Sequence, residues 1–196
     1  MPANRPNNYG YSFFDNLPYE SIVDEVRRYE QLKQDGTYAA SNFFANPEME
    51  TVSTITNFEE ATEIAYSSWF LENYTYSSGG VNPAQRSKNV KLSHGVFALH
   101  KGLHMMNAMN LCTKGTPLTD VRVSFAENNG EQMVEKYSYT FTKSRIARVQ
   151  DIFNTSYYLL ILAMGTIDGE YTAYDIDGED AGNAAFSFDS TLGTEA

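Results

Sequence analysis

The chain has few cysteines, histidines and basic residues, and it lacks long apolar runs. Its 196 residues include one Cys, one Trp and three His, and 14 Lys and Arg stand against 25 Asp and Glu. One cysteine excludes an internal disulfide. No stretch reaches the roughly 18 consecutive apolar residues of a membrane-spanning helix, so we expect no membrane insertion. The formal net charge of −11 argues against nucleic-acid binding, because an acidic surface repels phosphate backbones.

The chain also lacks the patterns of common catalytic and targeting motifs. It has no GxSxG, no P-loop and no GxGxxG, and nothing in the sequence pairs its carboxylates into an acid–base site. We therefore expect no enzyme activity and no cofactor. The start, MPANRPNNYGYSFF, lacks the basic and then apolar segments of a signal peptide, so we expect assembly in the cytoplasm.

The stretch HKGLHMMNAMNLCTKG, residues 100 to 115, holds most of the residues that could carry metal or redox chemistry. His100 and His104 are four apart, but HKGLH lacks the Glu of the HExxH zinc motif. His94 or a distant carboxylate would have to supply a third ligand. The stronger interpretation is an amphipathic helix over residues 101–113 that ends at Gly115. Its apolar side comprises Met105, Ala108, Met109 and Cys112.

A second helix is predicted near the N-terminus, over residues 18–35. Residues 21–24 resemble a capping box, and Gly36 is a plausible end. The predicted apolar stripe comprises Ile22, Val26, Tyr29 and Leu32. Residues 1–16 read as an extended arm, residues 37–57 show no clear period, and residues 58–63 could form one helical turn.

The rest of the chain has the alternation and turn residues of β-strands. Strands are predicted at 63–77, 90–100, 120–127, 135–142 and 144–152, and residues 156–175 form one long strand or two joined near Gly165. Several short strands at this spacing favour a small barrel or sandwich. We divide the chain into an N-terminal extension (1–57), a β-barrel domain (58–176) and a peripheral acidic tail (177–196).

A long loop is predicted between the first two of these strands, at residues 77–89. Glycine, proline and small polar residues give it its turn character, and it carries two basic residues. Its distinctive members are Gly79, Gly80, Val81, Asn82, Pro83, Arg86 and Lys88.

The order of these elements resembles the Hcp (haemolysin-coregulated protein) family, the inner-tube subunits of type VI secretion systems. The family's typical run has a Lys before a helix that ends in a Cys-containing turn, here Lys101 and residues 112–115. A Gly-Glu-Gln turn (130–132) then leads to a Tyr-rich strand, here residues 135–141. An apolar strand, a Gly, an Ile-acidic pair and Glu-Tyr-Thr follow at 159–172. The resemblance covers about residues 63–176, and the ordered series carries it.

The resemblance implies a β-barrel with one packed helix, here with an N-terminal helical extension as an addition to the family pattern. It implies a homo-hexamer whose rings stack into a tube, with the 77–89 loop as the stacking element. It further implies sheath, spike, baseplate and effector cargo proteins as partners, and ejection through the contractile machine. Two alternatives stay open. One is a tail tube of a phage or extracellular injection particle, found in the virion tail. The other is a monomeric β-barrel ligand-binding module centred on His94, His100 and His104.

Overall fold

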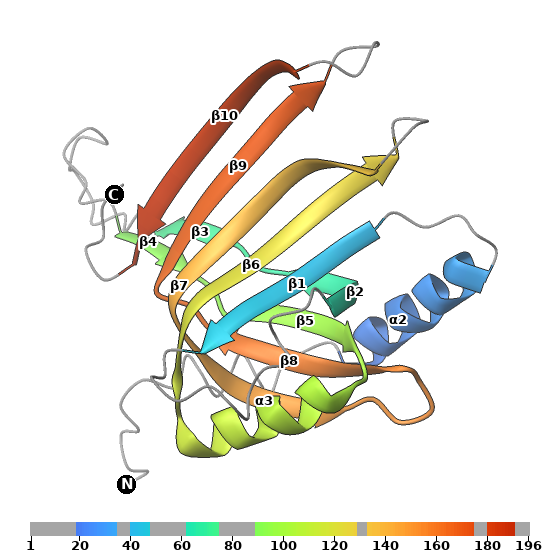
Figure 1. Ribbon diagram of the computed structural model, residues 1–196. Helices are drawn as coiled ribbons and strands as arrows, with labels where there is room; N and C mark the ends of the chain where they lie inside the picture. The colour runs from blue at the N-terminus through green and yellow to red at the C-terminus, as the bar shows by residue number, and fades with distance from the viewer. Residues whose placement is uncertain are drawn as a thin grey trace, which may run out of the picture.

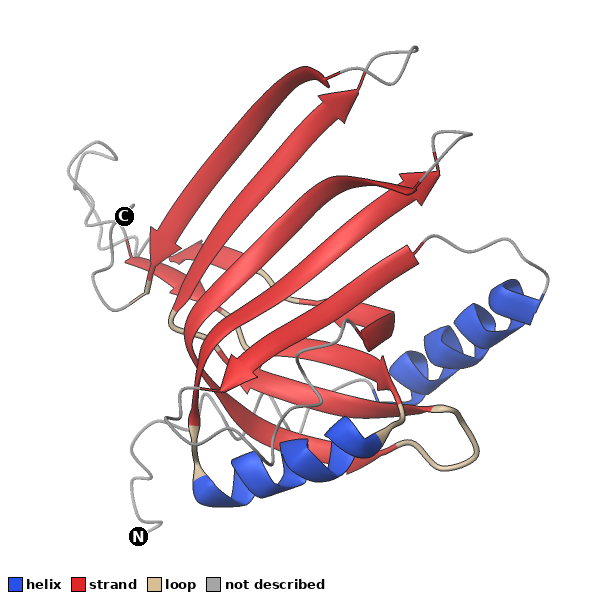
Figure 2. Ribbon diagram, viewed as in Figure 1, coloured by secondary structure: helices blue, strands red, loops and turns tan. Residues whose placement is uncertain are grey.

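The computed structural model describes residues 19–34, 40–47, 62–74, 89–128, 133–174 and 180–190 (Figure 1). The helices are α2 (Tyr19–Gln34) and α3 (Leu103–Lys114). The strands are β1 (Ala40–Pro47), β2 (Thr62–Ser68), β3 (Leu71–Tyr74), β4 (Asn89–Leu92), β5 (Gly95–His100), β6 (Pro117–Asn128), β7 (Met133–Asp151), β8 (Tyr157–Ala163), β9 (Thr166–Tyr174) and β10 (Asp180–Asp189). The described residues are mainly β with two helices, in agreement with the predicted class (Figure 2).

Six strands close into a barrel. The hydrogen-bonded order β7-β6-β1-β2-β5-β8 returns to β7 through a β7–β8 pairing. Closure is possible because β7 is long and pairs with β8 only through its C-terminal part, Arg145 to Asp151. The N-terminal part of β7 pairs instead with β9, which in turn pairs with β10.

Strands β9 and β10 therefore stand outside the barrel wall, together with the adjoining parts of β6 and β7. We call this extension the wing: β9, β10, residues 133–141 of β7, residues 121–128 of β6 and the start of β1, which pairs with them. Figure 1 shows the wing rising above the barrel, with α3 below the barrel and α2 beside it. The short ribbon formed by β3 and β4 is a separate two-stranded sheet.

The main core fills the barrel and is sealed by α3. Phe97, Leu99, Phe141 and Leu160 are fully buried there. Helix α3 contributes Met105, Ala108 and Leu111 to this core. The helix ends as predicted at Gly115, whose φ of 63° is the left-handed conformation that glycine adopts without strain.

A second, smaller core lies between α2 and the outer face of the barrel. Ile22, Val23 and Val26 are buried against Val96, Ala98, Ile152, Tyr157 and Leu159 of the wall. Burying an aliphatic side chain of this size contributes about 2 kcal/mol. The predicted stripe of α2 is thus the face that packs on the barrel, although Tyr29 and Leu32 remain half-buried.

The described strands differ from the predicted ones at several places. The aromatic stretch 63–77 breaks after Ser68 into β2 and β3, and 90–100 breaks at Ser93-His94 into β4 and β5. The two strands predicted at 135–142 and 144–152 are one continuous strand, β7. The stretch 156–175 contains two strands, β8 and β9, in agreement with the second of the two alternatives predicted for it. Strand β1 lies in the segment where no period was visible. Strand β2 begins at Thr62, inside the segment considered as a helical turn, whose residues 58–61 lie outside the described part.

The C-terminal segment differs most from its prediction as a peripheral tail. Residues 180–189 form β10, which pairs along its whole length with β9. Phe188 enters the main core and Asp189 is buried. A stretch of small residues reads as a loop in isolation, but a neighbouring strand supplies hydrogen bonds that its composition cannot indicate.

Candidate functional site: the wing

The inner face of the wing continues the face that lines the barrel core. Because side chains alternate along a strand, Phe141, Tyr139 and Tyr137 of β7 share one face. Phe141 is fully buried in the core, Tyr139 is partly buried, and Tyr137 is half-exposed. The same gradient runs along β9, from buried Ile167 to Tyr171, which is 48% exposed. The core face therefore emerges into solvent toward the tip of the wing.

Aromatic rings dominate this emerging face. Phe125 stacks on Tyr137 with 4.4 Å between ring centroids, and Tyr137 stacks on Tyr171 at 6.4 Å. Tyr139 meets Phe186 edge to face at 6.4 Å. We call Phe125, Tyr137, Tyr139, Tyr171 and Phe186 the aromatic face. Exposed aromatic clusters of this kind are typical of protein–protein interfaces.

A groove of about 420 Å³ runs through the aromatic face. Its lining residues are Tyr137, Tyr139, Gly169, Glu170, Tyr171, Ala184, Ala185 and Phe186. Three small residues, Gly169, Ala184 and Ala185, leave the space between the rings. The groove is therefore built by β7, β9 and β10 together.

Trp69 marks the boundary between the barrel core and the wing. Its ring meets Tyr139 at 4.9 Å and Phe141 at 5.3 Å, both edge to face. It also lies 5.9 Å from the ring of Phe97. The chain's single tryptophan thus joins the end of β2 to the base of the aromatic face.

The opposite face of the wing is polar. Arg122 donates to Glu135 at 2.5 Å and to Ser138 at 3.3 Å. Ser187 donates to the carboxylate of Asp168. The two faces of the same sheet therefore differ sharply in chemistry, and only the aromatic face is suited to burial against another protein surface.

The backbone edges of the wing are the second feature of the site. Within the described residues β10 pairs with β9 alone, and β1 pairs with β2 only at Asn42 and Phe43 while it pairs with β6 from Ala40 to Pro47. The wing sheet thus has β10 along one border and the start of β1 along the other. Exposed strand edges of this kind are templates for pairing with another chain.

The predicted stacking loop lies outside the described residues up to position 88, with its members Gly79, Gly80, Val81, Asn82, Pro83, Arg86 and Lys88. The ribbon on either side of it is described. Tyr74 and Asn89 face each other in register, so the loop leaves from the end of the β3–β4 ribbon. Phe70 and Leu71 at the base of the ribbon are 47% and 41% exposed.

The residues predicted for the apolar side of the 101–113 helix lie in the main core or against it. Met105 and Ala108 are buried in the main core, while Met109 and Cys112 are partly buried against it. Leu111 is also buried in this core, with 1% of its surface exposed, whereas Met106 is 53% exposed. Lys101, the family's Lys before the helix, donates to the carbonyls of Ile152 (3.0 Å) and Thr155 (2.8 Å) and pairs with Asp151 at 2.6 Å.

The histidines do not converge. His104 Nε2 lies 2.7 Å from the carbonyl oxygen of His100, and the His100 ring meets Tyr157 edge to face. Burial lowers the pKa of His104, against the hydrogen bond to His100, which raises it. Burial also lowers the pKa of His94, with the charge of Lys91 adding to the effect. No group of three or more His, Cys, Asp or Glu side chains in the described residues is arranged to hold a metal ion.

A polar cleft of about 580 Å³ separates the end of α2 from the barrel. Its lining residues are Glu30, Lys33, Gln34, His100, Asn154, Thr155, Ser156 and Tyr157. Beside it, Glu63 accepts hydrogen bonds from Lys33 and from the Tyr157 hydroxyl (2.5 Å), and Glu30 accepts one from the Ser156 amide (2.8 Å). Burial raises the pKa of Glu63, but the hydrogen bonds from Lys33 and Tyr157, together with the charges of Lys33 and His100, lower the pKa below its usual value. These polar contacts stabilise the packing of α2 against the barrel wall.

None of the described helices is long and apolar enough to cross a membrane.

No protein-family model and no curated protein matches the chain. Several solved structures match the chain. A type six secretion system protein has a TM-score of 0.65 at 11% identity, and the match covers 81% of this chain and 100% of that chain. Hcp1 from E. coli EAEC 042 has a TM-score of 0.61 at 12% identity, covering 78% and 99%. Hcp1 from Salmonella typhimurium has a TM-score of 0.56 at 17% identity, covering 80% and 99%.

Each of these solved chains is matched over almost its whole length, and about a fifth of the present chain lies outside each match. At such low identity the similarity concerns the arrangement of the backbone. The resemblance found in the order of sequence elements is therefore confirmed at the level of architecture: this chain has an Hcp-like fold.

Proposed function

We propose that this chain is the structural subunit of the inner tube of a contractile injection machine of the type VI secretion kind. Six copies form a ring, rings stack into a tube, and effectors travel in or on the tube. Sheath, spike and baseplate proteins are its other partners. The subunit assembles in the cytoplasm and leaves the cell by ejection, and it performs no catalysis.

The observation that carries the proposal is the wing, a sheet with two open borders and an aromatic face. A ring forms when one border of each copy meets the other border of the next, which is a heterologous contact that closes on itself. In such a ring β10 of one copy lies beside β1 of its neighbour. The similarity of the whole barrel to Hcp structures supports the same conclusion.

The strand directions define what kind of contact this is. Four successive antiparallel pairings, β10–β9, β9–β7, β7–β6 and β6–β1, separate the two borders. Strands β10 and β1 therefore run in the same direction, and rotation about a ring axis keeps that direction. The contact between copies is thus parallel, a pairing slightly weaker than the antiparallel one. Burial of the aromatic face against the neighbour supplies further stabilisation.

The stacking of rings is assigned to the loop at the end of the β3–β4 ribbon, residues 77–89. Phe70 and Leu71 are exposed at the base of the ribbon and would join the contact between rings. A tube with an acidic subunit surface would let cargo pass with little adhesion. The same assembly would also serve the tail of a phage or an extracellular injection particle.

Light scattering and negative-stain imaging of the purified chain test the proposal. We expect a ring-shaped particle of about six times the 22.0 kDa monomer mass, or tubes made from such rings. A chain that stays monomeric at every concentration, alone and with preformed Hcp-type tubes or spikes as templates, would contradict it.

Two substitutions test whether ring formation depends on the wing. Phe186→Ser removes an anchor of the aromatic face, and Ala185→Lys places a charge on the border strand, opposite Glu170 within the same copy. Both should yield folded monomers. Gln31→Lys, on the exposed side of α2, adds the same charge away from the wing and should leave rings intact.

A further inference from the structure

Strand β7 changes partners in the middle of its length, and this branch point joins the barrel to the wing. Thr140 is the last β7 residue paired with β9, and Arg145 is the first paired with β8. Between them Lys143 has a φ of 52°, which is uncommon for a residue other than glycine and turns the strand. The branch point is therefore one of the places that set the angle between the wing and the barrel, beside β6 and the contact of Trp69 with Tyr139.

A compact set of polar contacts surrounds the branch point. The hydroxyls of Thr142 and Thr166 lie 2.5 Å apart, and the Thr142 amide donates to Thr166 Oγ1 at 3.1 Å. The Gly165 amide donates to the Thr142 carbonyl at 3.2 Å. Ser190 donates to the Gly165 carbonyl from its amide (2.9 Å) and its hydroxyl (2.5 Å). These bonds join β7, β9 and the end of β10.

Close packing adds to the polar contacts. A Cβ on Gly165 would lie 2.7 Å from the Cβ of Lys143 and 3.2 Å from its carbonyl oxygen. The turn between β8 and β9 can therefore approach β7 only because residue 165 has no side chain.

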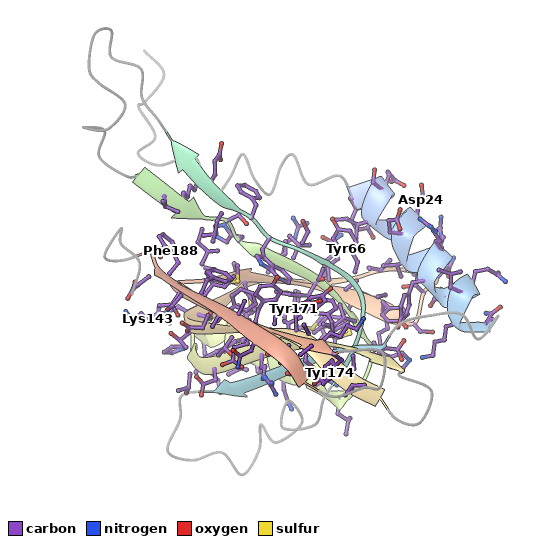
Figure 3. All side chains as sticks on the ribbon, turned by 90° about the horizontal axis from the view of Figure 1, so that it is seen from above. Asp24, Tyr66, Lys143, Tyr171, Tyr174 and Phe188 are labelled. Carbon is purple, nitrogen blue, oxygen red and sulfur yellow. The ribbon has the colours of Figure 1, made fainter. Side chains whose placement is uncertain are left out.

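An ion pair spans the branch point. Lys143 Nζ lies 2.7 Å from Asp189 Oδ2, and the Asp189 side chain is only 9% exposed. The pair connects the turning residue of β7 to the last residue of β10. Figure 3 shows Lys143 and Phe188 together at one end of the wing, with Tyr174 at the other end. The pair thus lies at the base of a sheet whose border strand has ten residues and spans roughly 30 Å.

We infer that Lys143 and Asp189 are positioning residues that set the angle of the wing to the barrel and thereby the number of copies in a ring. This inference rests on the proposed function. A closed ring of six needs a rotation of about 60° per copy, whereas a ring of seven needs about 51°. A change of about 9° at the base of the wing is therefore enough to alter the count. The Lys143 side chain is 56% exposed and the Asp189 side chain is buried, and a charge-assisted hydrogen bond between them adds to the main-chain bonds that resist such a change.

The test uses substitutions that remove the pair and keep the backbone. Lys143→Asn suits the positive φ, because asparagine tolerates that conformation, and Asp189→Asn keeps shape and loses charge. The charge swap Lys143→Asp with Asp189→Lys restores an ion pair of opposite sense. Arg27→Gln on α2, where the pair with Asp24 is largely exposed, is the control for loss of one positive charge.

Amide hydrogen exchange measures how firmly the wing is held at the branch point, whether the chain is monomeric or assembled. We expect residues 166–174 and 180–189 to exchange about tenfold faster in Lys143→Asn and Asp189→Asn, as loss of a charge-assisted hydrogen bond predicts, with residues 157–163 unchanged. The swap should restore most of the protection. Unchanged exchange in the wing would overturn the inference.

Particle imaging measures the number of copies in each ring. We expect one ring size for the wild-type chain and the control, and mixed sizes or open arcs for the two single variants. Single variants that form uniform rings of the wild-type count would overturn the link to ring size. A wild-type chain that forms no rings overturns the proposed function and that link with it, while hydrogen exchange still decides whether the pair holds the wing.

Discussion

Gly169 on β9 lies directly against the ring of Phe186 on β10, and any side chain at residue 169 would require that ring to move. A Cβ on Gly169 would lie 2.2 Å from Phe186 Cε1 and 3.1 Å from Tyr139 Cε1. The two residues face each other in register, so the contact follows from the pairing of the last two strands. The absence of a side chain at residue 169 is what allows Phe186 to lie across the groove.

Gly169→Ala should disturb the groove without unfolding the barrel. The added methyl forces the Phe186 ring outward, and overpacking of this kind costs about 1–3 kcal/mol. We expect a lower Tm and weaker self-association, measured by thermal denaturation and sedimentation. The double variant Gly169→Ala with Phe186→Ala should recover the lost Tm, because the smaller side chain makes room. If the Tm does not recover, the displaced aromatic ring of Phe186 is not the cause of the lost stability.

Lys101→Met should destabilise the barrel although the residue lies near the surface. The ammonium group satisfies two carbonyls of the turn after β7, and hydrogen bonds to charged groups are worth about 1.5–3 kcal/mol each. Chemical denaturation measures the loss. Lys114→Met, at the exposed end of α3, is the matched control and should change stability by less than about 0.5 kcal/mol. Equal effects of the two variants would contradict this role for Lys101.

Val26→Ala should loosen α2 from the wall. Val26 is fully buried in the second core, and its truncation leaves a cavity that costs about 2 kcal/mol. Hydrogen exchange should rise in residues 19–34 more than in the barrel strands. Glu20→Ala, on the exposed side of the same helix, should leave exchange unchanged. A uniform rise over the whole chain would instead mean that α2 and the barrel unfold together.

Acid should release α2 through Glu63. The folded-state pKa of Glu63 lies below its ordinary value of 4.5, so its contribution to stability is fully present above that pH and is lost as the pH falls through the folded pKa. Protease sensitivity of residues 19–34 should therefore rise below about pH 4.5. Glu63→Gln keeps hydrogen bonding and removes the charge, so it should weaken α2 at neutral pH and flatten this acid dependence. An unchanged acid response in Glu63→Gln would refute the assignment.

His104 should add a second pH dependence at milder acidity. Burial lowers its folded-state pKa from 6.5, so stability is fully present above about pH 6.5 and falls as the pH drops through the folded pKa. His94 shifts in the same direction and contributes over the same range. The variant His104→Gln should show a smaller loss of Tm between pH 7 and pH 5 than the wild-type chain does. A loss of equal size in both would assign the effect to other groups.

Local signals predicted the elements that depend on local physics. Both helices have an apolar stripe and an end signal, and the structure places them at 19–34 and 103–114. Gly115 ends α3 because its left-handed conformation lets its amide reach the carbonyl of Cys112. Val121, Val123 and Phe125 alternate along β6 and share its inner face, because a period of two is the direct result of strand geometry.

Signals that depend on distant neighbours were missed. Strand β1 has no visible period, and it gains its hydrogen bonds from β6, a strand far away in sequence. Strand β10 reads as a tail of small residues, and it gains its hydrogen bonds from the preceding strand β9. The groove residues Ala184, Ala185 and Phe186 lie in that supposed tail, so the sequence alone could not bring them to Tyr137. The contact of Trp69 with the base of the aromatic face likewise depends on the packing of the end of β2 against β7.

The amino-acid sequence alone thus determined the mainly β class, the two helices, the acidic surface and the order of elements that resembles Hcp. Each of these depends on composition or on neighbours within a few residues. Only the tertiary structure decided that β7 branches, that the barrel closes through β8, and that a wing with an aromatic face extends from it. These depend on pairings between strands far apart in the chain, for which the burial and hydrogen bonding of the whole fold select the register.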